Sequence, residues 1–181
     1  MNKLVLDHRK TESLVSKIAR EIAIGDWKPD YIVGLTRGGL IPAVMLSHYL
    51  DVPLHTLNVS LRDHENAESN LWMAEDAITP SMVETGSFPQ YEHTRKNILI
   101  VDDINDTGAT VNWIIDDWTN GCDPNNPLWE NDVWNVNVRF AMLVDNLASD
   151  AYVKMDYTGM EINKAENDVW VDFPWEDWWT K

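Results

Sequence analysis

The chain has 181 residues, of which 30 are acidic and 14 are basic, so its formal net charge is −16. That length suits one domain with a full hydrophobic core and is short for two. The charge argues against binding nucleic acid or an anionic membrane surface through bulk attraction. We interpret the acidity as a well-solvated surface.

Cysteine content and apolar runs bear on the compartment. Cys122 is the single cysteine, which excludes an internal disulfide framework and fits a reducing environment. The amino-terminal stretch lacks the apolar run of a signal peptide, and no segment approaches the roughly 18 to 20 apolar residues of a membrane span. We therefore expect a cytoplasmic protein with no membrane partner.

The first predicted elements are a helix, a strand and a second helix. Residues 11–25 have apolar side chains at helical spacing, with Thr11 as the expected N-cap and Gly25 as the stop. The short apolar run YIVGL at 31–35 is typical of a buried strand. The segment 39–50 then predicts a helix, with a proline tolerated in its first turn.

The middle of the chain is less regular. Residues 52–61 predict a second strand, after which the segment 62–92 loses strong periodicity and fills with polar side chains. Only the stretch 70–78 has the pattern of a short helix. We interpret 62–92 as a long, mobile excursion that could act as a lid.

Regular elements resume at residues 97–103, which predict a third buried strand, followed by a helix over 108–121. A turn-rich insertion at 122–135 precedes a fourth strand over 136–146. The tail after residue 150 is rich in tryptophan and acidic residues and has no clean period.

The alternation of strands and helices predicts an α/β fold, with a mostly parallel twisted sheet flanked by helices. We expect a single domain over residues 1–181. Its core spans about 10–148 and includes the mobile excursion 62–92, and a small C-terminal hood spans about 150–181.

A group of aspartates at the end of the third strand carries the clearest chemical signal. Asp102, Asp103 and Asp106 are followed by small and hydroxyl residues where the next helix should begin. Free main-chain N–H groups at a helix start can hold a phosphate, and carboxylates can accept hydrogen bonds from vicinal sugar hydroxyls while Mg²⁺ bridges the remaining charge. The implied ligand is a phosphorylated sugar, and the alternative is that the aspartates only cap a turn.

The stretch ILIVDDINDTGAT at 98–110 resembles the signature of the type I phosphoribosyltransferases. These enzymes transfer the 5-phosphoribosyl group of PRPP to a nitrogen base and release diphosphate. The resemblance implies that Asp102 and Asp103 hold the ribose hydroxyls, that Asp103 contacts the magnesium, and that Asp106 reaches the ring N7 of a purine as the catalytic residue. The PRPP-binding residues implied are Arg37, Gly38, Asp102, Asp103, Ile104, Asn105, Asp106, Thr107, Gly108, Ala109 and Thr110.

A second stretch, IVGLTRGGLIP at 32–42, is similar to the diphosphate loop of the same family. The implied loop consists of Thr36, Arg37, Gly38 and Gly39. The two glycines free the backbone to turn its N–H groups toward an anion, and the arginine adds positive charge. The alternative is a tight strand-to-helix turn with an exposed arginine.

A third stretch, DVWVDFPWED at 168–177, is similar to the hood of the xanthine-guanine branch. It implies that Trp170 stacks on the base and that Val171 supplies main-chain contacts. We interpret the other tryptophans of the tail as core or interface residues: Trp175, Trp178 and Trp179. The segment SLRDHEN at 60–66 resembles the start of the mobile loop of that branch.

Two positions depart from the family pattern. Purine-using members place a lysine after the last core strand, where it hydrogen-bonds the 6-oxo group, but Asn146 stands there in this chain and Lys154 is the nearest substitute. Glu68 stands near the position of a loop arginine that reaches the diphosphate, which leaves Arg62 to compensate. Turnover could therefore be weak.

The expected function is transfer of the phosphoribosyl group to a nitrogen base, with a 6-oxopurine (xanthine, guanine or hypoxanthine) favoured, in purine salvage. The alternative on the same fold is a non-catalytic regulator that binds PRPP or a nucleotide. We also expect Mg²⁺ as cofactor, small-molecule substrates, and a homo-oligomer, either a dimer or a tetramer.

Two other classes of protein fit poorly. A signal-receiver domain, with Asp145 as phosphoacceptor, leaves the NDTGAT stretch without a role, and only 78 residues follow Asp103. The five histidines show no metal-ligand spacing.

Overall fold

The computed structural model describes residues 2–59, 67–86 and 90–180. Its center is a five-stranded sheet with the order β3-β2-β6-β7-β8, in which every pairing is parallel. The strands are Tyr31–Leu35 (β2), Leu54–Leu57 (β3), Ile98–Asn105 (β6), Val138–Asn146 (β7) and Tyr157–Ile162 (β8). The predicted α/β fold with a mostly parallel sheet is confirmed.

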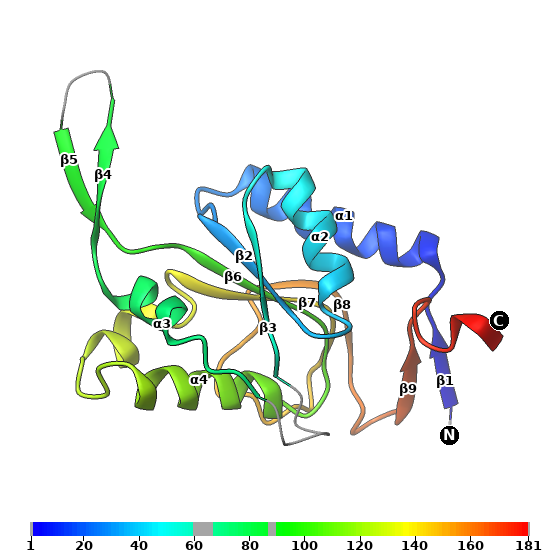
Figure 1. Cartoon of the computed structure of the whole chain (residues 1–181). Helices are drawn as coiled ribbons and strands as arrows, with labels where there is room; N and C mark the ends of the chain where they lie inside the picture. The colour runs from blue at the N-terminus through cyan, green and yellow to red at the C-terminus, as the bar shows by residue number, and fades with distance from the viewer. Residues whose placement is uncertain (1, 60–66, 87–89, 181) are drawn as a thin grey trace.

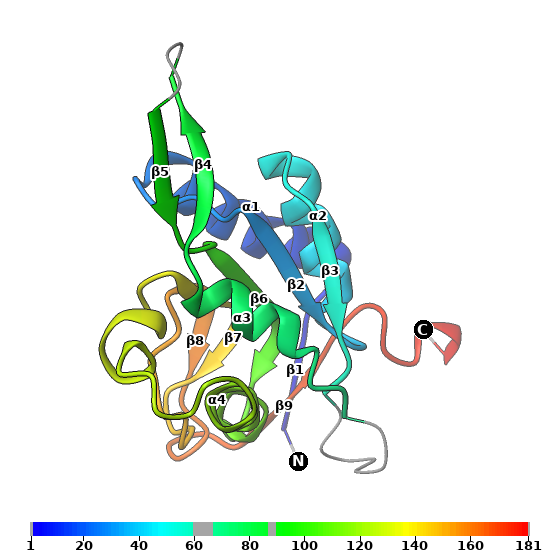
Figure 2. The same cartoon turned by 60° about the vertical axis from the view of Figure 1, so that its left-hand side comes forward.

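Two pairs of helices cover the two faces of this sheet (Figures 1 and 2). Helices α1 (His8–Ile24) and α2 (Leu40–Leu50) pack on one face with Leu99, Val101 and Leu143. Helices α3 (Leu71–Ile78) and α4 (Ala109–Gly121) pack on the other face with Ile100, Phe140 and Met142. Because both faces are buried, the central strands read as continuous apolar runs rather than as alternating ones.

Helix α1 begins four residues earlier than the sequence pattern indicates. Its N-cap is Asp7, whose side chain accepts a hydrogen bond from the main-chain N–H of Lys10 at 2.7 Å. Thr11, the expected cap, lies inside the first turn, where its hydroxyl donates to the carbonyl of Asp7 at 2.9 Å. The prediction of Thr11 as cap was wrong because Asp7, one helical turn earlier, is also a good N-cap residue and the apolar pattern does not rank the two. The predicted stop at Gly25 is confirmed.

The tail contributes a core strand. β8 pairs with β7 along the register Ala141↔Tyr157 to Asn146↔Ile162, so the sheet continues past the predicted core boundary at residue 148. The strand was missed because its sequence, YTGMEI, has only one buried residue, Gly159, and therefore shows no apolar alternation.

The predicted excursion over 62–92 contains two different structures. Helix α3 buries Met73, Ala74 and Ala77 and belongs to the core. The strands β4 (Ser81–Thr85) and β5 (Gln90–Thr94) form an antiparallel hairpin that projects from the molecule (Figures 1 and 2). The hairpin leads directly into the amino end of β6, so it stands at the end of the sheet opposite the acidic residues. It is therefore not placed to be a lid over them. The stretch 60–66 that resembles the mobile loop lies outside the described residues.

The insertion over 122–135 forms part of the core. It contains the short π-helix η1 (Trp129–Val133), with Trp129 only 2% exposed. The Trp129 ring stacks on that of Trp134 with centroids 5.5 Å apart, and Trp134 stacks in turn on Phe140 of β7. The aromatic side chains thus close the sheet face beyond the end of α4.

The two ends of the described chain meet in a small separate sheet (Figure 1). β1 (Asn2–Val5) pairs in parallel with β9 (Val169–Asp172), and a single turn of 3-10 helix (η2, Trp178–Thr180) follows. Within residues 2–59, 67–86 and 90–180, no helix has both the length and the apolar character needed to cross a bilayer.

Candidate functional site

The acidic loop and the glycine loop lie beside each other at the carboxyl end of the sheet. β2 and β6 are adjacent and parallel, with Gly34 opposite Val101, so the loops that follow them meet at the same edge. A Cβ atom placed on Gly38 would overlap the Asp103 carboxylate. One on Gly39 would come within 2.8 Å of the Asp102 Cα atom. The glycines are therefore needed for the two loops to approach, and ligands of open α/β sheets bind at this edge.

Asp102 and Asp103 form a partly buried pair of acidic side chains. The Asp102 carboxylate accepts a hydrogen bond from the main-chain N–H of Asp103 at 2.9 Å. Burial raises the pKa of Asp102 well above its usual range, and the charge of Asp103 raises it further. Burial also raises the pKa of Asp103, and Glu176 adds to the rise. Such a pair is costly in the folded chain unless a cation or hydrogen-bond donors join it.

Asp106 has a cationic partner. Its Oδ1 atom lies 2.7 Å from the ammonium nitrogen of Lys164, and its side chain remains 33% exposed. Its carbonyl accepts a hydrogen bond from the side-chain amide of Asn146 at 2.7 Å. Asn146 is thus buried and bound to the acidic loop itself.

Ile104 and Asn105 turn their side chains into the protein. Ile104 packs in the apolar cluster with α1 and α2. The buried Asn105 side chain donates to Asp145 at 2.8 Å and to the hydroxyl of Ser149 at 2.9 Å. These two predicted PRPP-binding residues therefore have only main-chain atoms to offer a ligand.

The N-terminus of α4 is exposed to solvent on one side. Gly108 is its N-cap with φ 86°, a left-handed conformation that favours glycine, and a Cβ there would overlap the backbone of Ala151. Thr107 and Ala109 are exposed, and the hydroxyl of Thr107 accepts a weak hydrogen bond from the N–H of Ala109 at 3.3 Å. Thr110, in the first turn, is partly exposed. The loop after β7 therefore covers one side of this helix start and leaves the other side to solvent, where N–H groups can bind an anion.

The glycine loop presents its basic residue to solvent. Arg37 is exposed, whereas the Thr36 hydroxyl donates to the side chain of Asn58 at 2.8 Å. Gly38 is partly exposed and Gly39 is buried. Thr36 therefore fixes the loop to the neighbouring strand end, and Arg37 remains available to an anion.

The tail comes close to the acidic pair at Trp175. Trp170 and Val171 lie in β9, where Val171 is only 5% exposed. Phe173 is fully buried, and the Trp175 ring stacks on it with centroids 4.9 Å apart. The Trp175 indole N–H, which has no hydrogen bond of standard geometry among the described residues, lies close enough to Asp103 to lower the pKa of that carboxyl. Trp175 is thus a neighbour of the site as well as a core residue.

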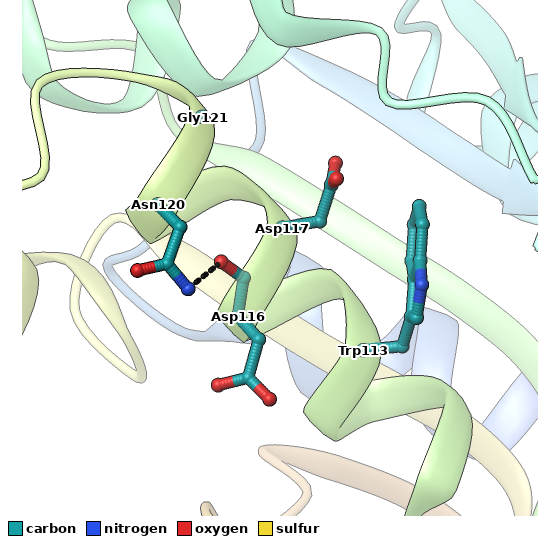
Figure 3. Close-up of a pocket in the computed structure, with 5 residues that line it drawn as sticks. All are labelled: Trp113, Asp116, Asp117, Asn120 and Gly121. Atoms are coloured by element: carbon teal, nitrogen blue, oxygen red, sulfur yellow. Dashed lines mark hydrogen bonds between the residues drawn. The ribbon is translucent and has the colours of Figure 1, made fainter.

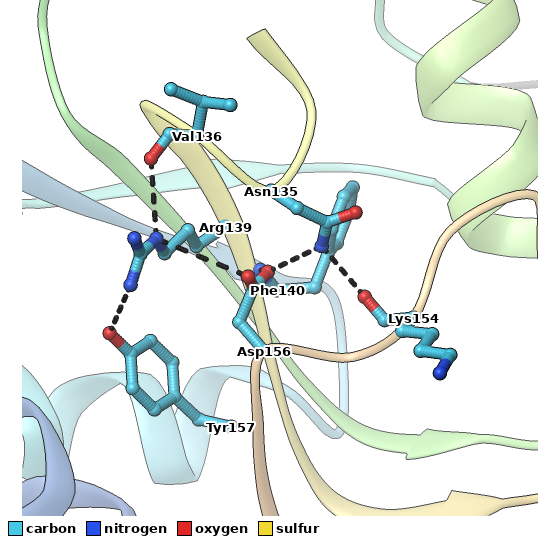
Figure 4. Close-up of polar contacts among 7 residues, drawn as sticks. All are labelled: Asn135, Val136, Arg139, Phe140, Lys154, Asp156 and Tyr157. Carbon is cyan, nitrogen blue, oxygen red and sulfur yellow. Dashed lines mark hydrogen bonds and ion pairs between the residues drawn. The ribbon is translucent and has the colours of Figure 1, made fainter. Parts of the chain in front are cut away.

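Lys154, the predicted substitute for the missing lysine, lies elsewhere. Its carbonyl accepts a hydrogen bond from the side chain of Asn135 at 2.8 Å, just before β7 begins (Figure 4). Asn146 ends the same nine-residue strand, so the length of β7, about 25 Å, separates the two positions. The prediction for Lys154 was wrong.

A pocket on the side of α4 does not include the acidic loop. It has a volume of about 420 Å³ and opens along the side of α4 (Figure 3). Its lining consists of Trp113, Asp116, Asp117, Asn120 and Gly121. The pocket begins in the second turn of α4 rather than at the amino end, so it does not include the anion-binding N–H groups.

Comparison with known families agrees with the arrangement of the two loops. Residues 2–178 match the family model described as the phosphoribosyl transferase domain. The chain belongs to this family. The match covers the whole of the central sheet, both loops of the site and the small sheet of β1 and β9, so the membership applies to the site as well as to the scaffold.

Three proteins illustrate the similarity of this phosphoribosyltransferase domain to others. Xanthine phosphoribosyltransferase 1 of Saccharomyces cerevisiae is 22% identical over 122 residues, 62% of this chain and 58% of its own length. The bifunctional protein PyrR of Endomicrobium trichonymphae is 23% identical over 179 residues, 92% of this chain and 89% of its own. The crystal structure of a purine phosphoribosyltransferase from Pyrococcus horikoshii Ot3 has 25% identity and a TM-score of 0.61, covering 98% of this chain and 96% of that one.

Two contacts of this phosphoribosyltransferase domain were not found by sequence reasoning, those of Lys164 and of Trp175. Lys164 follows a strand that had not been predicted, so nothing in the sequence aligned it with the acidic loop. Trp175 lies in a turn after β9, so no strand or helix period pointed to its position beside Phe173.

Proposed function

We propose that this chain transfers the 5-phosphoribosyl group of PRPP to a nitrogen base, with 6-oxopurines as the substrates, and releases diphosphate. The observation that carries the proposal is the contact of the two loops, in which Gly38 lies against the Asp103 carboxylate. An acidic pair suited to sugar hydroxyls and a glycine loop suited to diphosphate are then adjacent, as the two ends of PRPP require.

The site fits Mg²⁺ as a shared ligand of chain and substrate. Asp103 and Asp102 are partly buried oxygen donors, and oxygen donors suit this ion. Among the described residues no three metal-binding side chains cluster, so Asp103 would hold the ion together with substrate oxygens. When bound, the ion supplies positive charge at the departing diphosphate.

The protein's own contribution is positioning and charge stabilisation. The exposed Arg37 can meet the departing diphosphate, and the N–H groups at the start of α4 can hold the 5′-phosphate. The base nitrogen then attacks C1′ through a transition state with oxocarbenium character. Asp106 is the residue that accepts the proton lost by the base, because its carboxylate is partly exposed at the same edge.

A second candidate is a regulator that binds PRPP or a nucleotide without turnover. The basic residue in contact with the acidic loop, Lys164, is already paired with Asp106, which leaves Arg37 to stabilise the leaving group. Weak stabilisation of the leaving group would slow turnover and leave binding intact.

One assay tests both candidates. The full chain is given PRPP and Mg²⁺ with guanine, xanthine, hypoxanthine, adenine, uracil or orotate, and diphosphate release is followed. Release with a 6-oxopurine supports transfer. Calorimetric binding of PRPP without release from any base supports the regulator. If neither PRPP nor a nucleotide binds at millimolar concentration, both candidates are contradicted.

We also propose that the chain forms a homo-oligomer, dimer or tetramer, in the cytoplasm. Helix α2 is apolar on both sides, with Ile41, Val44 and Tyr49 exposed at 39%, 41% and 58%. On a chain with a net charge of −16, this uncharged face is where a second copy meets the least repulsion. The Val44→Glu variant places a charge on this face and should have a smaller molar mass in solution than the parent. Light scattering measures this difference.

A further inference from the structure

The loop after β7 is fixed to the start of helix α4 by one side chain. Asn112 lies in the first turn of this helix. Its amide nitrogen donates to the carbonyl of Asp150 at 2.9 Å, and its side-chain oxygen accepts from the main-chain N–H of Tyr152 at 2.7 Å. Because the two bonds use both polar atoms of a short side chain, they hold the loop in one position against the helix.

The same loop determines the direction of a peptide group at the start of α4. The main-chain N–H of Asp150 donates to the carbonyl of Thr107 at 3.0 Å. The peptide bond between Thr107 and Gly108 is trans, and the C=O and N–H of a planar trans peptide point in opposite directions. The N–H of Gly108 therefore points away from the loop after β7.

This N–H is left without an acceptor. Gly108 is buried, yet its N–H makes no hydrogen bond with any residue that the structure describes. A buried main-chain N–H is rarely unpaired in a folded protein, so the arrangement is costly unless a ligand supplies the acceptor. Because the group lies at the positive end of the α4 dipole, an anionic oxygen is the acceptor that it favours.

We propose that Asn112 is a positioning residue for the phosphate site at the start of α4. Asn112 holds the loop after β7, and the loop in turn holds the carbonyl of Thr107, so the N–H of Gly108 is aimed at a phosphate oxygen. Both polar atoms of the Asn112 side chain are bonded to the loop, so its effect on the phosphate passes through the loop. The inference rests on the proposed function, which places the 5′-phosphate of PRPP at this helix start.

The test compares two ligands that use different parts of the site. In the proposed function PRPP with Mg²⁺ occupies both the start of α4 and the glycine loop, whereas diphosphate with Mg²⁺ needs only the glycine loop. Calorimetry of the full chain should show that Asn112→Ala binds PRPP roughly tenfold more weakly than the parent and binds diphosphate within about twofold of it. A residue that only stabilises the fold would not distinguish the two ligands.

Asn120→Ala is the matched control. Asn120 lies about two turns further along α4, and its side chain donates to the carbonyl of Asp116 within the same helix at 2.8 Å. It therefore holds no loop, and its replacement should leave both affinities at the parent values. If circular dichroism shows that Asn112→Ala is unfolded, Asn112→Ser takes its place, because the serine side chain is too short to make both bonds.

The outcomes separate the two proposals. A PRPP affinity equal to that of the parent in the Asn112 variant, or equal losses for PRPP and diphosphate, overturns the role of Asn112 and leaves the proposed function standing. If the parent binds neither PRPP nor diphosphate at millimolar concentration, the proposed function fails and this inference fails with it.

Discussion

The two ends of the central sheet treat their buried carboxylates differently. At the amino end, Asp156 accepts hydrogen bonds from the main-chain N–H of Phe140 at 2.8 Å and from Asn135 at 2.9 Å, and Arg139 lies 4.0 Å away (Figure 4). The Arg139 guanidinium also donates to Tyr157 at 3.0 Å. At the carboxyl end, Asp102 and Asp103 face each other and Glu176.

The difference indicates which end is built for stability and which for a ligand. A carboxylate that is paired and hydrogen-bonded lowers the cost of its own burial, whereas two buried neighbours of like charge raise it. A folded chain retains such a pair where a ligand supplies the missing donors or cation. The comparison predicts that mutations at the two ends change different quantities.

The largest expected effect is on ligand binding at the carboxyl end. Asp103→Asn should weaken PRPP binding in the presence of Mg²⁺ by roughly tenfold to a hundredfold, because a charge-assisted acceptor is lost. The melting temperature should stay the same or rise, since one of two repelling charges is gone. Calorimetry and thermal unfolding measure the two effects. Asp116→Asn, which removes the same charge from the exposed side of α4, is the control and should leave PRPP affinity unchanged.

The amino end should respond in the opposite way. Asp156→Ala leaves the N–H of Phe140, the amide of Asn135 and the Arg139 guanidinium without this acceptor. We expect a loss of about 2–3 kcal/mol in the free energy of unfolding in urea, with PRPP affinity unchanged. A loss of PRPP affinity at constant stability would mean that the two ends are coupled and the comparison is wrong.

A smaller effect is expected from glycines that share a backbone conformation and differ in surroundings. Gly108 and Gly86 both have positive φ, 86° and 79°, but only Gly108 has backbone atoms of Ala151 where a Cβ would lie. Gly86→Ala should cost about 1 kcal/mol, and Gly108→Ala should cost about 2–3 kcal/mol and also weaken PRPP binding. If the two variants lose the same free energy of unfolding in urea, the loop after β7 moves to accommodate the added Cβ atom and the comparison is wrong.

The smallest effect concerns pH. Burial raises the pKa of Asp102 and Asp103 above the values they have in the unfolded chain, so the folded state binds protons more strongly. Their contribution to stability is therefore present at low pH and is lost as the pH rises above about 4 through the raised pKa values. Asp102→Asn should remove part of this loss, so its stability relative to the parent should grow from pH 4 to pH 7. Urea unfolding at several pH values measures the trend, and a constant difference would contradict it.

The sequence by itself determined the features that depend on neighbouring residues. The apolar runs of β2, β6 and β7 and the helices that follow β2 and β6 could be predicted, because burial on both faces and helix periodicity are local patterns. The acidic loop and the glycine loop could be assigned to one edge, because parallel strands end at the same edge. The glycines at 38 and 108 were expected to let an anion approach the backbone, and the structure shows another reason for them: a Cβ atom would meet the Asp103 carboxylate at one position and the backbone of Ala151 at the other.

Only the tertiary structure decided which distant segments complete the site. Lys164 reaches Asp106 because β8 pairs with β7 in the sheet. This pairing could not be predicted, because the sequence of β8 has no clear apolar pattern. From the sequence, Asn146 could be noted only as a position where a lysine was expected. In the structure its hydrogen bonds connect Asp106 and Lys164, which lie 58 positions apart in the chain. Local patterns fix strands and helices because neighbouring side chains share one burial requirement, but contacts between loops depend on strand order, which no local pattern encodes.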